Sequence, residues 1–221
     1  MTATSPPSIP VRTPRWWWIA SLLALGVAGY SLRYVVLGER AYVPELSASF
    51  GERPWAIAIH AFFGPIALVG GLIQFLPAMR TPGRWYWHRG IGKAYLVSAI
   101  VLGSAGLFMS MFSYGGAITH VGFAFLAIGT IGTTINAYRL IRSGKIAEHT
   151  RWMLRSYSLI FGAVTLRIWI PILMIATQGD FLTTYRIVAW ISWVPNILFA
   201  EWIIRRGWTP SYRLGATDIK P

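Results

Sequence analysis

The sequence predicts an all-α membrane protein with six transmembrane helices, and three observations support this: its composition, its apolar runs and the placement of its basic residues. Hydrophobic residues make up 55% of the 221 residues and charged residues only 12%. A soluble domain of this size needs more charge to cover its surface. Six apolar runs each reach the roughly 20 residues that a spanning helix needs. These runs are 16–37, 54–77, 91–112, 117–141, 153–177 and 181–204.

The six runs use nearly the whole chain, so we expect a single transmembrane domain over residues 16–206. Its second to fifth helices are expected to form a central four-helix bundle. The proline-rich segment 1–15 is expected to be a disordered cytoplasmic tail, and 207–221 a loosely ordered cytoplasmic tail.

Basic residues are concentrated in alternate connections, which orients the predicted helices. They precede the first run, follow the second and fourth runs, and follow the sixth, as Arg12, Arg15, Arg80, Arg84, Arg89, Lys93, Arg139, Arg142, Lys145, Arg151, Arg205 and Arg206. With six helices, all these segments fall on one side, and the positive-inside rule places both termini in the cytoplasm. The net charge of +13 is therefore a topology signal, and we expect no nucleic-acid partner.

The first two runs carry residues typical of membrane helices. Trp16 to Trp18 form an aromatic anchor at the interface, and Arg33 lies near the far end of its run, where its side chain can reach water. Pro54 suits the first turn of the second helix, and Pro65 inside it predicts a bend. The segment 42–53 between these runs is expected to be an outer loop with a short amphipathic turn.

The remaining runs carry small residues and prolines. Glycines recur along the third and fourth runs and permit close helix contacts. The fifth run contains Arg167 and then Pro171, and the sixth contains Pro195 and Asn196 about midway.

Each of the four central runs carries one of the four histidines. His60 and His120 lie roughly 5–9 Å inside the second and fourth helices, on the outer side. His88 and His149 begin the third and fifth helices, on the inner side. The interval from His60 to His88 is 28 residues and from His120 to His149 is 29, which indicates an internal near-repeat.

Two histidine pairs at two depths of a bundle can each supply both axial ligands of a haem iron. The leading hypothesis is therefore a transmembrane electron-transfer protein with one or two haem b groups, bound by His60 with His120 and by His88 with His149. The chain has no cysteine, which excludes iron–sulfur clusters and covalent c-type haem. The sequence leaves open whether the protein is an enzyme, whether it meets a quinone or a small redox donor, and whether it forms a homo-oligomer.

Other interpretations stand beside this one. Histidines favour membrane interfaces in any case, so His88 and His149 need no cofactor to explain them. Arg167 can bind a haem propionate or an anionic or quinone-like molecule beside the outer histidines, or it can reach the interface or pair with Asp180. The alternative function is a non-enzymatic membrane protein that binds or moves a small anion, proton or lipid through Arg167 and the outer histidines.

Two motifs carry a resemblance to a known family. They are His88-Arg89-Gly90-Ile91-Gly92 and Glu148-His149-Thr150-Arg151-Trp152-Met153, continued by Arg155-Ser156-Tyr157. The chain resembles, over about 54–172, a family of predicted bacterial membrane proteins of unknown function. This resemblance implies a multi-pass protein of the bacterial inner membrane.

The layout of the histidines also resembles the six-helix di-haem b-type transmembrane ferric reductases. In that family, histidines on helices two and four bind one haem, and those on helices three and five bind the other. The resemblance implies the pairs His60 with His120 and His88 with His149. In this chain the inner histidines stand at the helix starts rather than inside the membrane.

Overall fold

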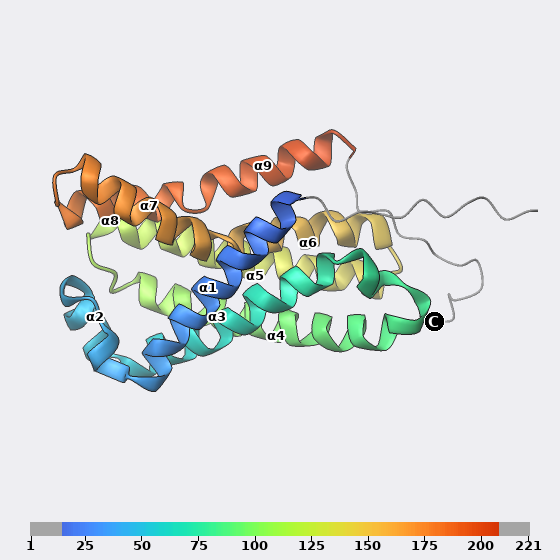
Figure 1. The fold of residues 1–221 in the computed structure, drawn as a ribbon, viewed down its shortest axis with the longest axis horizontal. Helices are drawn as coiled ribbons and strands as arrows, with labels where there is room; N and C mark the ends of the chain where they lie inside the picture. The colour runs from blue at the N-terminus through green and yellow to red at the C-terminus, as the bar shows by residue number, and fades with distance from the viewer. Residues whose placement is uncertain (1–14, 208–221) are drawn as a thin grey trace, which may run out of the picture.

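The computed structural model describes residues 15–207, and the two predicted tails otherwise lie outside these residues. Within this range the helices are α1 (Arg15–Val36), α2 (Ser47–Gly51), α3 (Pro54–Phe75), α4 (Trp85–Ser110), α5 (Ala117–Arg142), α6 (Ile146–Ile160), α7 (Gly162–Ala176), α8 (Phe181–Ile191) and α9 (Val194–Arg205). Short 3₁₀ turns cover Gly38–Ala41, Pro44–Leu46, Pro77–Arg80 and Pro82–Arg84. The long helices run along one axis as an elongated bundle (Figure 1).

Six helical segments of the described chain are long and apolar enough to cross a membrane. They are Trp17–Val36, Pro54–Phe75, Trp85–Ser110, Ala117–Arg142, Ile146–Ala176 and Phe181–Arg205. The last two each combine two helices, α6 with α7 and α8 with α9. The prediction of an all-α protein with six spanning helices is confirmed, and the chain is an integral membrane protein.

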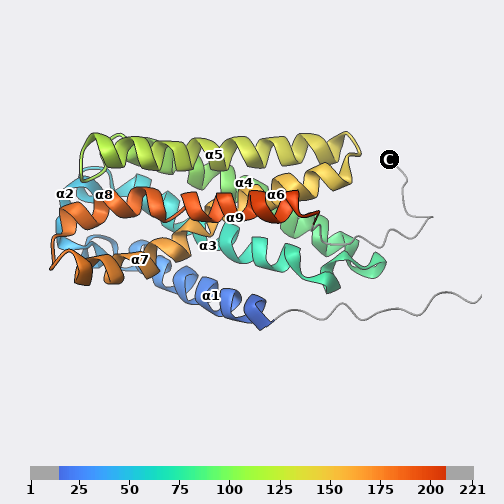
Figure 2. The ribbon, with the colours of Figure 1, turned by 90° about the horizontal axis from the view of Figure 1, so that it is seen from above.

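The central bundle consists of α3, α4, α5 and the pair α6–α7, which together form the fifth span. Sequential helices pack against one another, and α6 closes the bundle by contacting α3. α1 packs on α3, α8 packs on α5 and α7, and α9 packs on α6 (Figures 1 and 2). The expected central bundle of helices two to five is therefore present, flanked by the first and sixth spans.

The two ends of the bundle differ. The connections α3–α4 and α5–α6 lie at one end, which we call the basic end. α2 and the connections α4–α5 and α7–α8 lie at the opposite end, which we call the lid end (Figure 1). All the basic connections predicted to share a side thus lie together, whereas their cytoplasmic location stays a prediction.

Two helices begin earlier than their apolar runs. α4 begins at Trp85 rather than 91, and the fifth span begins at Ile146 rather than 153. In both cases the added turns carry arginines and aromatic residues that hydropathy alone leaves out. His88 and His149 therefore lie within the first two turns of their helices, at the basic end.

The fifth and sixth spans are each broken near their middle, and the breaks contact each other. α6 ends before Phe161, and α8 and α9 are separated by Ser192 and Trp193. Thr165 Oγ1 donates to the carbonyl of Ser192. Asn196 Nδ2 donates to the carbonyl of Ser192 at 3.1 Å and to Thr165 Oγ1 at 3.0 Å. These bonds satisfy backbone groups that a break would otherwise expose to lipid.

A chain of hydroxyls ties three bundle helices together in the core. Tyr95 Oη lies 2.7 Å from Ser156 Oγ, and Ser156 Oγ lies 2.7 Å from Thr134 Oγ1. Thr134 Oγ1 donates to the carbonyl of Thr130 at 2.7 Å. Because Thr134 donates its proton to Thr130, it accepts from Ser156, and Ser156 in turn accepts from Tyr95. Each of the three hydroxyl protons therefore has an acceptor. The network is a satisfied structural link between α4, α5 and α6.

Candidate functional site

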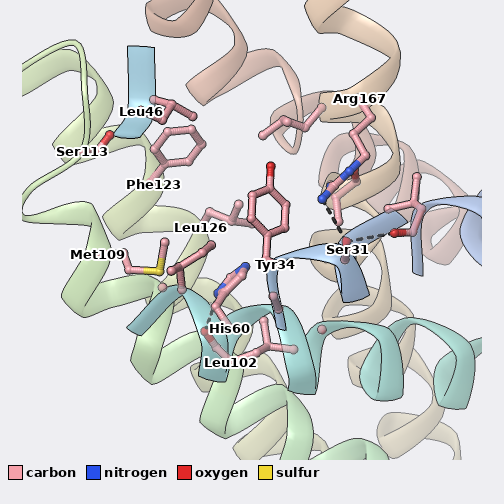
Figure 3. A pocket seen from close by; sticks show the side chains of 18 of the residues that line it. Ser31, Tyr34, Leu46, His60, Leu102, Met109, Ser113, Phe123, Leu126 and Arg167 are labelled. Atoms are coloured by element: carbon pink, nitrogen blue, oxygen red, sulfur yellow. Dashed lines mark hydrogen bonds between the residues drawn. The ribbon is translucent and has the colours of Figure 1, made fainter. Parts of the chain in front are cut away.

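A cavity of about 750 Å³ lies in the half of the bundle nearest the lid end. It is lined by α1, α3, α4, α5, α6, α7 and α8, and at the lid end by residues of the segments 43–53 and 112–114. Most of its lining side chains are aliphatic or aromatic, with a few polar groups. The polar groups that matter below are Ser31, Tyr34, His60 and Arg167. Figure 3 shows these four side chains, from α1, α3 and α7, around one space.

His60 reaches this cavity from α3, six residues after the helix begins at Pro54. Its Nδ1 lies 3.1 Å from the carbonyl oxygen of Leu102 on α4. Gly106 leaves the room for this contact, because a Cβ there would lie 3.3 Å from Cε1 of the imidazole. Among the described residues, the imidazole ring forms its hydrogen bond to Leu102 through Nδ1, so Nε2 remains available to a ligand (Figure 3).

Arg167 reaches the same cavity from α7. Its Nη1 donates to the carbonyl of Ala163 at 2.8 Å, and its Nη2 donates to Ser31 Oγ at 2.9 Å (Figure 3). Ser31 Oγ donates in turn to the carbonyl of Val27, which leaves its lone pairs for the guanidinium. Among residues 15–207 no carboxylate lies within 4 Å of Arg167, and the ion pairs there are Arg53–Glu52 and Arg155–Glu201.

The expected alternative partner of Arg167, Asp180, is engaged elsewhere. Asp180 is the N-cap of α8, and its carboxylate accepts from Thr183 Oγ1 at 2.6 Å and from the Thr183 amide at 3.1 Å. These hydrogen bonds hold the pKa of Asp180 below its ordinary value. Arg167 therefore keeps its positive charge toward the cavity without a protein counter-charge in the described residues.

The other predicted site residues lie elsewhere. His120, at the start of α5, places its Nε2 2.9 Å from the carbonyl of Ser113 and is not among the residues that line the cavity. At the basic end, His149 Nδ1 lies 2.8 Å from the carbonyl of Ala137. The His88 ring there packs edge-on to Trp85, with 5.4 Å between the ring centres. The structure thus brings His60 together with Arg167, and not with His120, at this cavity.

The first span supplies cavity residues that the sequence analysis did not single out. Ser31 and Tyr34 line the cavity, and Tyr30 lies with its ring centre 5.6 Å from the Arg167 guanidinium carbon. Arg33 stacks on Tyr30 at 4.0 Å and on Tyr34 at 4.9 Å. The sequence signal for this region is Arg33, a second arginine inside an apolar run. The sequence analysis interpreted it only as a side chain that reaches water at the interface.

No cluster of three or more histidine, cysteine or carboxylate side chains is arranged to hold a metal ion within residues 15–207. A haem needs at most two axial ligands from the protein, so its fit is judged at the cavity itself. There, His60 has the geometry of a ligand, because metal-bound histidines commonly donate their other ring nitrogen to a carbonyl. His120, its expected partner, does not line that space.

The chain is similar to a family of known proteins. A family model described as a predicted membrane protein, DUF2306, matches residues 57–204. No curated protein and no solved structure matches the chain. The matched region covers more than half of the 221 residues and includes His60, both inner motifs and Arg167. The six spanning helices agree with the description of the family. The chain therefore belongs to the DUF2306 family of predicted membrane proteins.

Proposed function

We propose that this protein is a non-enzymatic membrane protein that binds a small organic anion in the cavity at the lid end, through Arg167. The observation that carries the proposal is an arginine within a membrane span that faces a cavity and has no carboxylate within 4 Å in the described chain. Arg167 lies nine residues before the end of α7 at Ala176, which corresponds to about 14 Å along the helix.

The energetics favour an anionic partner. A charged side chain inside the bilayer costs about 2.5–3.5 kcal/mol or more, and such residues usually face the bundle interior and meet a counter-charge. Arg167 uses two of its five N–H donors on Ala163 and Ser31. The remaining donors suit a carboxylate or a phosphate, and charge-assisted hydrogen bonds are the stronger kind.

The rest of the cavity favours an apolar body on that anion. Leucine, phenylalanine and isoleucine side chains are frequent in the lining around the polar groups. Ligand sites of this size usually combine an apolar lining with a few polar groups that orient the ligand. An amphiphile with one acidic head therefore fits the lining better than a small inorganic anion.

Haem binding is the second candidate. It is supported by His60, whose Nδ1 bond to Leu102 leaves Nε2 toward a cavity of about 750 Å³, and by Arg167 as a partner for a propionate. Haem binding is the second candidate because His120, the expected second ligand, does not line this cavity. When bound, a haem would supply one-electron chemistry, and His60 would hold its iron.

The test uses the purified full-length protein in detergent and measures its thermal unfolding with dodecanoate and with dodecanol. We expect dodecanoate to raise the melting temperature in a concentration-dependent way, and dodecanol to raise it less. Arg167→Gln removes the charge and keeps a polar side chain, so we expect it to weaken dodecanoate binding about tenfold or more, from the loss of a charge-assisted bond. Arg40→Gln is the matched control, because Arg40 is exposed in the lid-end connection and does not line the cavity.

Equal responses to the carboxylate and the alcohol, or equal losses in both variants, would overturn the anion proposal. An absorption spectrum of the same preparation decides the second candidate. A Soret band that shifts on reduction and disappears in His60→Ala would support haem, and a colourless preparation that stays colourless after haem is added would exclude it.

A further inference from the structure

We infer that the head group bound at Arg167 carries two negative charges, as a phosphate monoester does, and that the side chains of Tyr34 and Arg33 complete its binding site. Tyr34 contacts the head group directly, and Arg33 supplies a second positive charge through Tyr34. This inference rests on the proposed function, because it assumes that an anion binds at Arg167. It adds the chemical class of the head group and two residues that select it.

Arg33 lies behind the wall of the cavity and does not itself line it. Its guanidinium carbon is 4.0 Å from the ring centre of Tyr30 and 4.9 Å from that of Tyr34, and both tyrosines line the cavity. Arg33 Nη2 donates to the Tyr34 hydroxyl at 3.2 Å. Its Nε is buried and has no hydrogen-bond partner among the described residues. The guanidinium is thus held on two cavity residues rather than extended into water.

The Tyr34 hydroxyl is prepared to donate to an anion. Its oxygen accepts from Arg33, and its own proton has no acceptor among residues 15–207. A hydroxyl that accepts from a cation is polarised and becomes a stronger donor. Figure 3 shows Tyr34 projecting into the space that Arg167 also faces. The Tyr34 O–H and the remaining N–H groups of Arg167 are therefore available to one bound head group.

Two arginines near one ring leave two positive charges to be compensated. The guanidinium carbons of Arg33 and Arg167 lie 4.0 Å and 5.6 Å from the ring centre of Tyr30, so the two cations are close neighbours. In the described chain neither has a carboxylate within 4 Å. A third arginine at the cavity, Arg53, is already paired with Glu52. Charges interact strongly where water is scarce, so a dianion fits the two unpaired arginines better than a monoanion.

A phosphate monoester matches this arrangement more closely than a carboxylate. It presents three terminal oxygens and, above its second pKa of about 6, close to two negative charges. A carboxylate offers two oxygens and one charge. The donors come from Arg167 and Tyr34 rather than from His60, whose Nδ1 donates to the Leu102 carbonyl and whose Nε2 is an acceptor in the neutral ring. The apolar part of the lining suits a hydrocarbon chain attached to the phosphate.

The experiment compares two ligands that share one chain and differ in charge. Dodecyl phosphate is a dianion at about pH 8, whereas methyl dodecyl phosphate is a monoanion. Their binding to the purified full-length protein in a neutral detergent is measured by isothermal titration calorimetry. We expect the wild-type protein to bind dodecyl phosphate about tenfold more tightly than the methyl diester, because only the dianion compensates both arginines.

Arg33→Gln removes the second charge, so we expect it to bring the two affinities to within about threefold of each other, mainly by weakening the monoester. Arg33→Lys keeps the charge and is expected to keep most of the preference. Tyr34→Phe keeps the ring and removes the hydroxyl, so it is expected to weaken both ligands about threefold to tenfold. Arg40→Gln is the matched control and is expected to change neither affinity, because Arg40 is exposed and does not line the cavity.

Equal affinities of the wild-type protein for the monoester and the diester would overturn the inference, and this comparison needs no variant. An undiminished preference in Arg33→Gln, or a preference lost equally in Arg33→Lys, would also overturn it. In each of these cases, dodecanoate binding that depends on Arg167 would leave the proposed function standing. If neither dodecanoate nor dodecyl phosphate binds, the proposed function and the inference fall together.

Inorganic phosphate, titrated alone, distinguishes the source of the head group. An affinity equal to that of dodecyl phosphate would show that free phosphate occupies the site between the two arginines, which supports the charge argument without an attached chain. Much weaker binding would assign the phosphate to an amphiphile, since the apolar lining then contributes to the affinity.

Discussion

Gly71 shows how a single residue determines the spacing of two helices. A Cβ at this position would lie 2.2 Å from Cδ2 of Tyr157 and 3.0 Å from Cε2 of Tyr95. The Tyr157 hydroxyl donates to the carbonyl of Leu68 at 3.2 Å, one turn earlier on α3. Tyr157 also belongs to the buried hydrophobic core, together with Tyr95 and Leu72. Its ring therefore lies flat against a helix surface that only a glycine leaves open.

Gly71→Ala is accordingly expected to destabilise the protein by about 1–3 kcal/mol, because the ring of Tyr157 cannot move without losing its hydrogen bond. The measurement is the thermal unfolding of the purified protein in detergent. Gly132→Ala is the control, since a Cβ on Gly132 meets nothing within 4 Å, and it is expected to leave the melting temperature unchanged or slightly higher. Equal melting temperatures for the two variants would contradict the packing argument.

At the scale of single residues, one part of the site could be predicted from the sequence and another part could not. A charge inside an apolar run is visible in any sequence, so Arg167 was found. Ser31 is an ordinary residue of an apolar run, and its role appears only through its contact with Arg167, 136 residues away. The tyrosine partners of Arg33, Tyr30 and Tyr34, are its neighbours on α1, and what the sequence could not show is that Tyr30 also lies beside Arg167 of α7.

At the scale of elements, the two broken spans form one unit. α6–α7 and α8–α9 meet at their breaks, where Asn196 also reaches the carbonyl of Ser158 at 3.3 Å. A Cβ on Gly162 would lie 3.4 Å from the Ser192 carbonyl oxygen, so the two backbones approach closely. Pro195 in the first turn of α9 fits a helix that restarts after Trp193. The sequence indicated Pro195 and Asn196, but not a break in the fifth span.

Asn196→Ala is expected to lower the free energy of unfolding by about 1–3 kcal/mol, because the carbonyls of Ser158 and Ser192 each lose one donor in an apolar environment. A double variant with Thr165→Ala is expected to cost less than the sum of the single variants, since the two side chains share one network. Asn136→Ala is the control, because no side-chain hydrogen bond of Asn136 occurs within the described residues. Additive losses would show that the two breaks are stabilised independently.

At the scale of the whole molecule, even numbers of crossings separate the basic connections from one another, and odd numbers separate them from the lid end. The positive-inside rule then predicts that the basic end faces the cytoplasm and the cavity lies toward the outer leaflet. The chain has no cysteine, so single cysteines can be introduced without any other change.

We expect Glu45→Cys, in the lid-end connection, to react with a membrane-impermeant maleimide in intact cells. Ser143→Cys, in the α5–α6 connection, is expected to react only after the membrane is permeabilised. Both positions are exposed, so a difference in labelling reports sidedness rather than burial. The reverse pattern would invert the predicted topology.

Hydropathy and charge by themselves determined that the chain crosses the membrane six times, roughly where each crossing lies, and which connections share an end. These properties follow from the thickness of the bilayer and the cost of burying charge, which act on each segment separately. The depth of each histidine could be estimated in the same way.

Only the tertiary structure decided that His60 shares a cavity with Arg167 and that His120 turns to the carbonyl of Ser113 instead. The direction in which a side chain points depends on how each helix is rotated and which helices are its neighbours. Close packing of side chains such as Tyr157 on Gly71 determines both, and it joins residues that lie far apart in the sequence.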